Sequence, residues 1–150
     1  MTATLFVDTN VFVYAVDPRV RKKQARAAVV LRAICANCRV VVSTQVLQEY
    51  YAAVTRKLEP PMSHDAAAES TRQLATLDVR AVDAQTVLGA IRRAGARSVS
   101  IWDSLIVQSA VESGCSVLLT EDLSHGEVID GVRIVDPFQG DEGEVLALFA

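Results

Sequence analysis

Short apolar runs alternate with longer amphipathic segments along this chain. The apolar runs are typical of strands that are buried on both faces, and they comprise residues 5–7, 39–43, 116–120 and 132–135, with a weaker alternating run at 77–82. Between them, apolar residues recur at helical spacing over residues 20–36, 45–54, 63–75, 83–94 and 101–111. This order predicts an α/β fold with three layers, α/β/α, around a mostly parallel central sheet.

Boundary residues refine these elements. Asp17-Pro18 should end the apolar segment that follows the first strand, because proline breaks a helix that reaches it. Ser43 or Thr44 is expected to cap the helix over 45–54, and Gly95 the end of the helix over 83–94. Ser100 and Asp103 have the spacing of a capping box, which would put Asp103 in the first turn of a helix.

Composition narrows the class of protein. Of the 150 residues, 51 % are hydrophobic and 22 % are charged, so we expect one globular domain over residues 1–150. No apolar run has the length of a transmembrane helix, and no signal-peptide pattern opens the chain. The three cysteines therefore indicate reduced thiols and a cytoplasmic protein. Cys35 and Cys38 have the spacing of a redox or zinc pair, but without a second pair a structural role is favoured.

Charge is distributed unevenly. Residues 1–57 contain nine Lys or Arg and three acids, a net charge of +6, whereas residues 58–150 contain six Arg and fifteen acids, a net charge of −9. Basic residues gather in the first turns of the helix expected over 20–36, namely Arg21, Lys22, Lys23 and Arg26. Such a cluster can bind the phosphate backbone of a nucleic acid, and a solvated helix face is the alternative.

Four carboxylates are expected at one edge of the sheet. Asp8 and Asp122 follow buried strands directly, while Glu49 and Asp103 lie near the starts of helices. The carboxyl ends of the strands in such a sheet form the crevice in which ligands bind. Each acid alone also fits a simpler role, solvation for Glu49 and capping for Asp103. Together they would repel one another unless a cation offset their charge, and oxygen donors without Cys or His favour Mg²⁺ or Mn²⁺, the ions of phosphoryl transfer.

The segments around these acids resemble the PIN-domain nucleases, and most closely the VapC-like toxins of toxin–antitoxin pairs. The matching segments are Val7-Asp8-Thr9-Asn10-Val11, Ser43-Thr44-Gln45-Val46-Leu47-Gln48-Glu49, Asp103-Ser104-Leu105-Ile106 and Leu119-Thr120-Glu121-Asp122-Leu123-Ser124-His125-Gly126. Each motif is weak by itself, but the four occur in order and span nearly the whole chain.

The resemblance implies an acidic Mg²⁺ or Mn²⁺ site that cleaves RNA and leaves a 5′-phosphate. It assigns catalytic, metal-binding roles to Asp8, Glu49, Asp103 and Asp122. Supporting roles are implied for Thr9, Asn10, Ser43 and Thr120, and Glu121 is an ambiguous neighbour of the last acid. The family also implies a homodimer and an antitoxin partner that inserts a segment near the active site.

Two positions leave details of the site open. Some relatives carry another acid two residues beyond Asp122, where this chain has Ser124, so one or two metal ions remain possible. His125 could approach the substrate.

Two other functions compete with the nuclease. A haloacid-dehalogenase-like phosphatase also places an acid after its first strand, but its second carboxylate would fall at Asn10, and no lysine follows Lys57 to supply the basic residue expected later. The other alternative is a non-catalytic module that binds RNA or a protein partner, in which the acids cap helices. That module would not depend on a metal ion.

Overall fold

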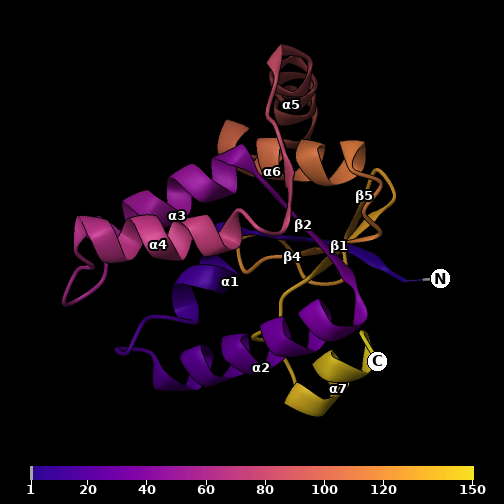
Figure 1. The fold of residues 1–150 in the computed structure, drawn as a ribbon. Helices are drawn as coiled ribbons and strands as arrows, with labels where there is room; N and C mark the ends of the chain where they lie inside the picture. Colours follow the sequence, from indigo (N-terminus) through magenta and orange to yellow (C-terminus); the bar gives the residue numbers. More distant parts are fainter. Residues whose placement is uncertain (1) are drawn as a thin grey trace.

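Six strands form one sheet in the order β3-β2-β1-β4-β6-β5, as seen in the computed structural model, which describes residues 2–150 (Figure 1). The strands are β1 (Thr4–Val7), β2 (Arg39–Ser43), β3 (Asp78–Arg80), β4 (Val117–Leu119), β5 (Val128–Ile129) and β6 (Val132–Val135). All neighbouring strands are parallel except β5, which pairs antiparallel with β6 at one edge. The predicted α/β fold with a mostly parallel sheet is therefore confirmed.

Helices connect the strands and cover the sheet. They are α1 (Thr9–Tyr14), α2 (Arg21–Asn37), α3 (Thr44–Arg56), α4 (His64–Leu74), α5 (Ala84–Arg97), α6 (Ile101–Glu112) and α7 (Glu142–Ala147). Figure 1 shows α2 and α7 together on one side of the strands and α6 on the other, with α5 standing outside α6. No helix within residues 2–150 is both long enough and apolar enough to cross a membrane.

The core lies in the central strands. Leu5, Phe6 and Val7 of β1 and Leu118 and Leu119 of β4 are completely buried. A strand that is apolar at every position needs cover on both faces, and the helices on the two sides of the sheet supply it.

The sheet changes direction between β1 and β4. From β1 the chain winds outward through β2 to β3, and it then returns to place β4 on the other side of β1. Connections that diverge from two adjacent parallel strands leave a crevice beyond their carboxyl ends. Asp8 and Thr120 are the first residues beyond these two strands, so they lie at that crevice.

Hydrogen bonds at the helix ends confirm several predicted boundaries. The Ser43 hydroxyl accepts a hydrogen bond from the Val46 amide at 3.4 Å, and the Ser100 hydroxyl accepts one from the Asp103 amide at 3.1 Å. These hydroxyls satisfy backbone donors that a first helical turn otherwise leaves free. The second contact fixes Asp103 in the first turn of α6.

Some predicted boundaries are wrong. The helix over 83–94 continues through Gly95 to Arg97 and ends at Ser98, whose φ of 56° is left-handed. Alanine and arginine after Gly95 favour helix, so a single glycine does not end it. The strand expected over 77–82 is limited to Asp78–Arg80 because this strand lies at the edge of the sheet and pairs only with β2. Neither β5 nor α7 was predicted, since both are short.

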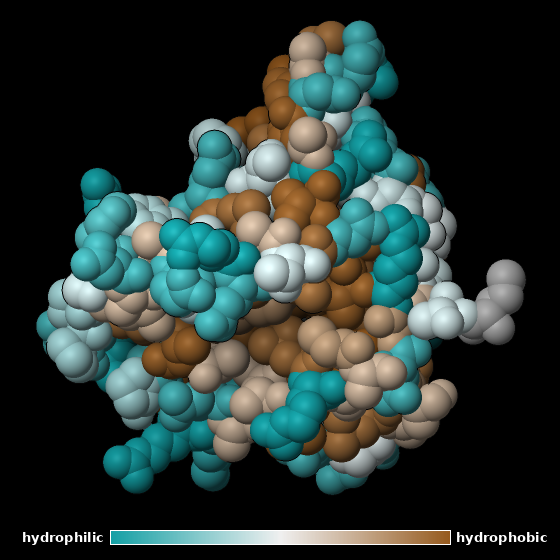
Figure 2. Space-filling model, viewed as in Figure 1, coloured by the Kyte–Doolittle hydropathy of each residue, from teal (hydrophilic) through white to brown (hydrophobic). Residues whose placement is uncertain are grey.

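The surface is mixed, with apolar residues concentrated in a few places. Figure 2 shows brown residues along the protruding α5 and below it on the face in view. Leu88 and Ile91 of α5 and Trp102 of α6 are each at least half exposed.

Candidate active site

Three of the four predicted acids line one cleft. Its volume is about 340 Å³, and Asp8, Glu49 and Asp122 lie in its wall with Asn10. Asp103 is outside that lining but close enough to Asp122 for the negative charge of Asp122 to raise its pKa. The structure therefore brings the four predicted carboxylates to the same edge of the sheet.

Hydrogen bonds join the two acids that follow strands. The Thr120 hydroxyl donates to Asp8 Oδ2 at 2.8 Å and accepts from the Asp122 amide at 3.1 Å. The Asn10 amide nitrogen donates to Asp8 Oδ2 at 3.3 Å and to Asp122 Oδ2 at 3.1 Å. Asn10 also accepts from the Glu121 amide, so it links the first turn of α1 to the loop after β4. Thr120 and Asn10 thus hold Asp8 and Asp122 in a fixed relation.

Asp8 is a buried acid with an unusual pKa. Only 5 % of its surface is exposed, and burial raises the pKa of its carboxyl from 3.8 to about 7. The Thr120 hydroxyl and the Thr9 amide lower this pKa, whereas the charges of Asp122 and Glu49 raise it. Because a buried carboxylate is costly without a counter-charge, a cation at this position would stabilise the ionised form.

The two acids on helices have fewer hydrogen-bond partners. Glu49 Oε1 is buried and has no hydrogen-bond partner within residues 2–150. Burial raises the pKa of Glu49, and the charges of Asp103 and Asp122 raise it further. Burial likewise raises the pKa of Asp103. The pKa values of three of the four acids are therefore raised, and a positive charge beside them would lower these values.

Donor chemistry at the cleft fits a hard divalent cation. Besides Glu49 Oε1, the Thr9 hydroxyl and the Gln45 carbonyl oxygen are buried without partners among the described residues. Oxygen ligands of this kind suit Mg²⁺ or Mn²⁺. Nevertheless, no group of three His, Cys, Asp or Glu side chains within residues 2–150 is arranged so that it could hold a metal ion. Binding would therefore require the carboxylates to move closer together.

Glu121 points away from these acids. Its Oε1 accepts a hydrogen bond from the Tyr14 hydroxyl at 2.6 Å, and its Oε2 pairs with the Lys23 ammonium at 2.5 Å. The same ammonium lies 4.6 Å from the centre of the Tyr14 ring and 5.4 Å from that of Phe138. We call Tyr14, Lys23 and Glu121 the Glu121 anchor. It ties the loop that carries Asp122 to α1 and α2.

The remaining predicted residues have mixed surroundings. Ser43 is fully buried and caps α3. His125 is exposed, and its Nδ1 accepts from the Asp136 amide at 3.0 Å. His64 Nδ1 lies 2.7 Å from the Tyr51 hydroxyl, and Cys35 and Cys38 form no disulfide.

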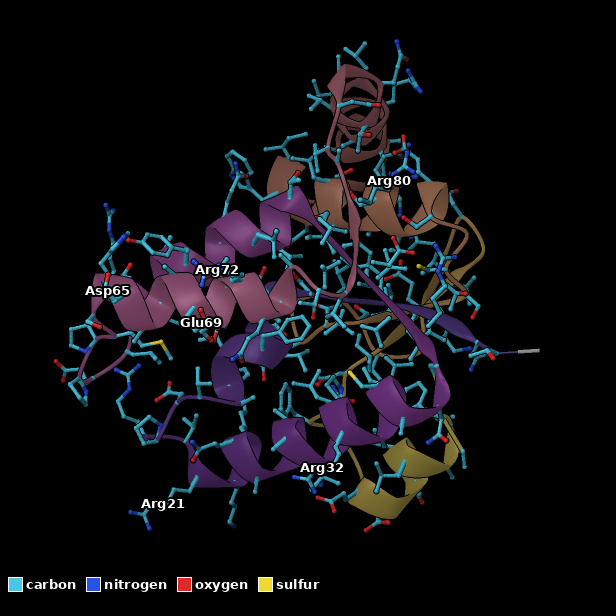
Figure 3. The ribbon with its side chains drawn as sticks, viewed as in Figure 1. Arg21, Arg32, Asp65, Glu69, Arg72 and Arg80 are labelled. Carbon is cyan, nitrogen blue, oxygen red and sulfur yellow. The ribbon has the colours of Figure 1, made fainter. Side chains whose placement is uncertain are left out.

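The predicted RNA-binding cluster divides into two pairs. Lys23 belongs to the Glu121 anchor, and Arg26 pairs with Glu142 and donates to backbone carbonyls of residues 137–140. Arg21 and Lys22 are exposed, and Figure 3 shows Arg21 extending outward from the start of α2. In this structure, only Arg21 and Lys22 of the cluster are available to a ligand.

The sequence did not single out Gln45 or the Glu121 anchor. Gln45 lies one helical turn before Glu49, and its amide nitrogen donates to the Trp102 carbonyl at 3.1 Å, which joins the starts of α3 and α6. The four-residue spacing could have indicated that Gln45 and Glu49 share a face. No local pattern could have paired Tyr14 and Lys23 with Glu121.

Comparison with solved structures finds the same fold in VapC toxins and VapBC complexes. VapBC2 from Rickettsia felis, bound to a DNA fragment from their promoter, matches with a TM-score of 0.61 and 15 % identity over 87 % of this chain and 96 % of that one. DNA-bound VapBC from Salmonella typhimurium matches with a TM-score of 0.63 and 21 % identity over 91 % and 99 % of the two chains. VapC20 from Mycobacterium tuberculosis, a Sarcin-Ricin loop cleaving toxin, matches with a TM-score of 0.56 and 22 % identity over 76 % and 86 %.

Sequence comparison gives the family. No curated protein sequence matches this chain. The family model of the PIN domain matches residues 5–129, which include all four acids and both strands that flank the crevice. A match over this much of the chain confirms the resemblance that the motifs indicated. The chain therefore belongs to the PIN-domain family.

Proposed function

We propose that this chain is a Mg²⁺- or Mn²⁺-dependent endoribonuclease that hydrolyses phosphodiester bonds in RNA. The observation that carries the proposal is the meeting of Asp8, Glu49, Asp103 and Asp122 at the β1/β4 crevice, where burial and mutual repulsion raise the pKa of the first three. Such a set of oxygens is costly by itself and is stabilised by a divalent cation.

Each side chain has a role in this proposal. The four acids would hold the metal, which when bound supplies charge stabilisation for the phosphate and a water of lowered pKa. Thr120 and Asn10 orient Asp8 and Asp122 through the hydrogen bonds they donate. Thr9 and Gln45 add uncommitted oxygens beside the acids. Such supporting groups fix the direction of the ligands they touch.

The same proposal includes partners. VapBC complexes and VapC20, a Sarcin-Ricin loop cleaving toxin, share this fold, which supports a role as the toxin of a toxin–antitoxin pair. We infer a cognate antitoxin on the same basis. A homodimer is inferred from the family resemblance, and a cytoplasmic site of action from the reduced thiols that the cysteines indicate. The PIN-domain match favours a nuclease over the phosphatase alternative, and the Asn10 amide, which donates to Asp8, cannot act as a general acid.

Cleavage of a labelled RNA by the purified protein tests the proposal. We expect cleavage with Mg²⁺ or Mn²⁺, none with EDTA, and a loss of more than about 100-fold in the Asp8→Asn variant, since even supporting residues of metal sites contribute 10–100-fold. Asp65→Asn is the matched control, because Asp65 is an exposed acid in the first turn of α4 (Figure 3) and does not line the cleft. Cleavage that survives Asp8→Asn or EDTA would refute the assignment.

A further inference from the structure

Two cations line the same cleft as the acids. Glu49, Ala53 and Lys57 are four residues apart along α3 and all lie in the cleft wall. A spacing of four residues keeps side chains on one face, and eight residues correspond to about 12 Å along a helix. Lys57 therefore lies further along the cleft than Glu49. Arg19 lines the cleft with it.

Arg19 is held rigidly at this end of the cleft. Its Nε and Nη2 donate to the two oxygens of Asp17 at 3.1 and 3.2 Å, and its Nη2 also donates to the Lys57 carbonyl at 2.7 Å. Asp17 is only 6 % exposed. Within residues 2–150, Arg19 Nη1 forms no hydrogen bond, so one edge of the guanidinium is available.

Lys57 lies close enough to Glu49 for its positive charge to lower the pKa of that acid. The Lys57 carbonyl is bound by Arg19, but its ammonium takes part in no hydrogen bond or ion pair of the described chain. A role at the end of α3 explains the favourable position of a cation there, because the helix dipole is negative at that end. Arg19 lies beside it as a second cation, paired with Asp17, which lines the same cleft.

The lining between acids and cations is apolar. Two apolar residues lie in the cleft wall. In the sequence, Val13 of α1 comes between Asp8 and Arg19, and Ala53 of α3 comes between Glu49 and Lys57. α1 begins directly after Asp8, and α3 runs from Glu49 in its second turn to Lys57 at its C-terminal end. The cleft therefore has acids at one end and Arg19, Lys57 and the Arg19 partner Asp17 at the other. A nucleotide strand has matching features, since apolar faces of sugar and base separate successive phosphates.

We propose that Arg19 and Lys57 form a phosphate-binding subsite that receives the RNA backbone next to the phosphate at the acids. This inference rests on the proposed nuclease function and adds a direction for the strand, along the cleft between α1 and α3. The rigid guanidinium presents a planar donor edge, and the ammonium adds a mobile point charge. A carboxylate-rich peptide is the competing ligand for such cations.

Binding of a fluorescent single-stranded RNA in EDTA, where the proposed cleavage stops, tests the subsite. Lys57→Met should weaken RNA affinity about fivefold and reduce the slope of log K against log salt by about 0.7, the contribution of one phosphate contact in a single strand. Arg56→Met is the matched control, because Arg56 is the adjacent exposed cation and does not line the cleft. It should leave both quantities unchanged.

Kinetics and a second variant sharpen the result. With Mg²⁺ present, Lys57→Met should raise KM while kcat stays close to its original value, as expected for lost substrate binding. Arg19→Lys keeps the charge but loses the planar fork, so it should weaken RNA binding less than Lys57→Met. Thermal melting checks that each variant is folded.

Three outcomes would overturn the subsite. They are equal effects of Lys57→Met and Arg56→Met, unchanged RNA affinity in Lys57→Met, and a loss in Lys57→Met of affinity for a polyglutamate peptide without a loss for RNA. In each case, RNA cleavage that still depends on Asp8 would leave the nuclease assignment standing. Loss of that dependence would instead refute the proposed function.

Discussion

The two acids that follow strands and the two acids that lie on helices are held in place by different contacts. Asp8 and Asp122 share the Thr120 hydroxyl and the Asn10 amide, so their separation is set by hydrogen bonds. Glu49 has a buried carboxylate oxygen without a partner among the described residues, and Asp103 is fixed mainly through its backbone at the start of α6. One half of the site is preorganised, whereas the other half depends on what binds.

This difference explains why the four acids meet without forming a finished metal site. Parallel pairing of β1 with β4 fixes the strand acids, because backbone hydrogen bonds set their register. The helix acids project from α3 and α6, whose starts are joined by the hydrogen bond from Gln45 to the Trp102 carbonyl, and their like charges repel one another. We therefore expect a divalent cation to change the positions of Glu49 and Asp103 more than those of Asp8 and Asp122.

The largest expected effect concerns the buried strand acid and pH. The pKa of Asp8 is about 7 in the folded protein against an ordinary value of 3.8, so the folded state binds a proton that the unfolded chain has already lost. Stability from this group is present below about pH 4 and is lost as pH rises through 7. The full difference corresponds to about 4 kcal/mol.

Denaturant unfolding in EDTA measures this effect. The free energy of unfolding of the wild type should fall relative to that of Asp8→Asn by up to about 4 kcal/mol between about pH 4 and pH 8. At the higher pH, saturating Mg²⁺ should restore part of the lost free energy of unfolding of the wild type, because a ligand of the folded state stabilises that state. Parallel pH profiles of the two proteins would contradict the prediction.

The helix acids should show opposite effects on activity and stability. Glu49→Gln and Asp103→Asn should each raise the Mg²⁺ concentration for half-maximal RNA cleavage by about 10-fold or more. Glu49→Gln should also raise the melting temperature in EDTA, because it removes a half-buried charge whose Oε1 has no hydrogen-bond partner within residues 2–150.

Glu69→Gln is the control for these variants, since Glu69 is an exposed acid of α4 that pairs with Arg72 (Figure 3). It should change neither the Mg²⁺ requirement nor the melting temperature appreciably. An unchanged Mg²⁺ requirement in both Glu49→Gln and Asp103→Asn would remove the helix acids from the metal site.

The smallest expected effect concerns the Glu121 anchor. Lys23→Met removes the cation that Glu121 and the Tyr14 ring contact, so the loop carrying Asp122 should become less well fixed. RNA cleavage should fall about 10-fold, with a higher Mg²⁺ requirement and unchanged RNA affinity in EDTA. Lys22→Met is the matched comparison, and it should instead weaken RNA affinity without a change in the Mg²⁺ requirement. A loss of RNA affinity in Lys23→Met equal to that in Lys22→Met would show that Lys23 contacts RNA directly.

The sequence by itself determined five of the six strands, most helices and the edge at which the acids lie. Leu5-Phe6-Val7 predicts a buried strand because every position is apolar, and Asp8 directly after it must then lie at the carboxyl end. The same reasoning places Asp122. Ser100 indicates the start of α6 because its hydroxyl can cap a helix. These features depend on residues close together in the chain, so local chemistry is sufficient to predict them.

Only the tertiary structure decided which side chains from distant parts of the chain contact one another. The Asn10 amide reaches Asp122 across 112 positions of the chain, and Lys23 reaches Glu121 across 98. The sequence grouped Lys23 with Arg21 and Lys22 as one basic surface, but folding directs it to an internal partner. Such pairs arise from strand order and helix packing, which bring distant residues together, and no local periodicity encodes them.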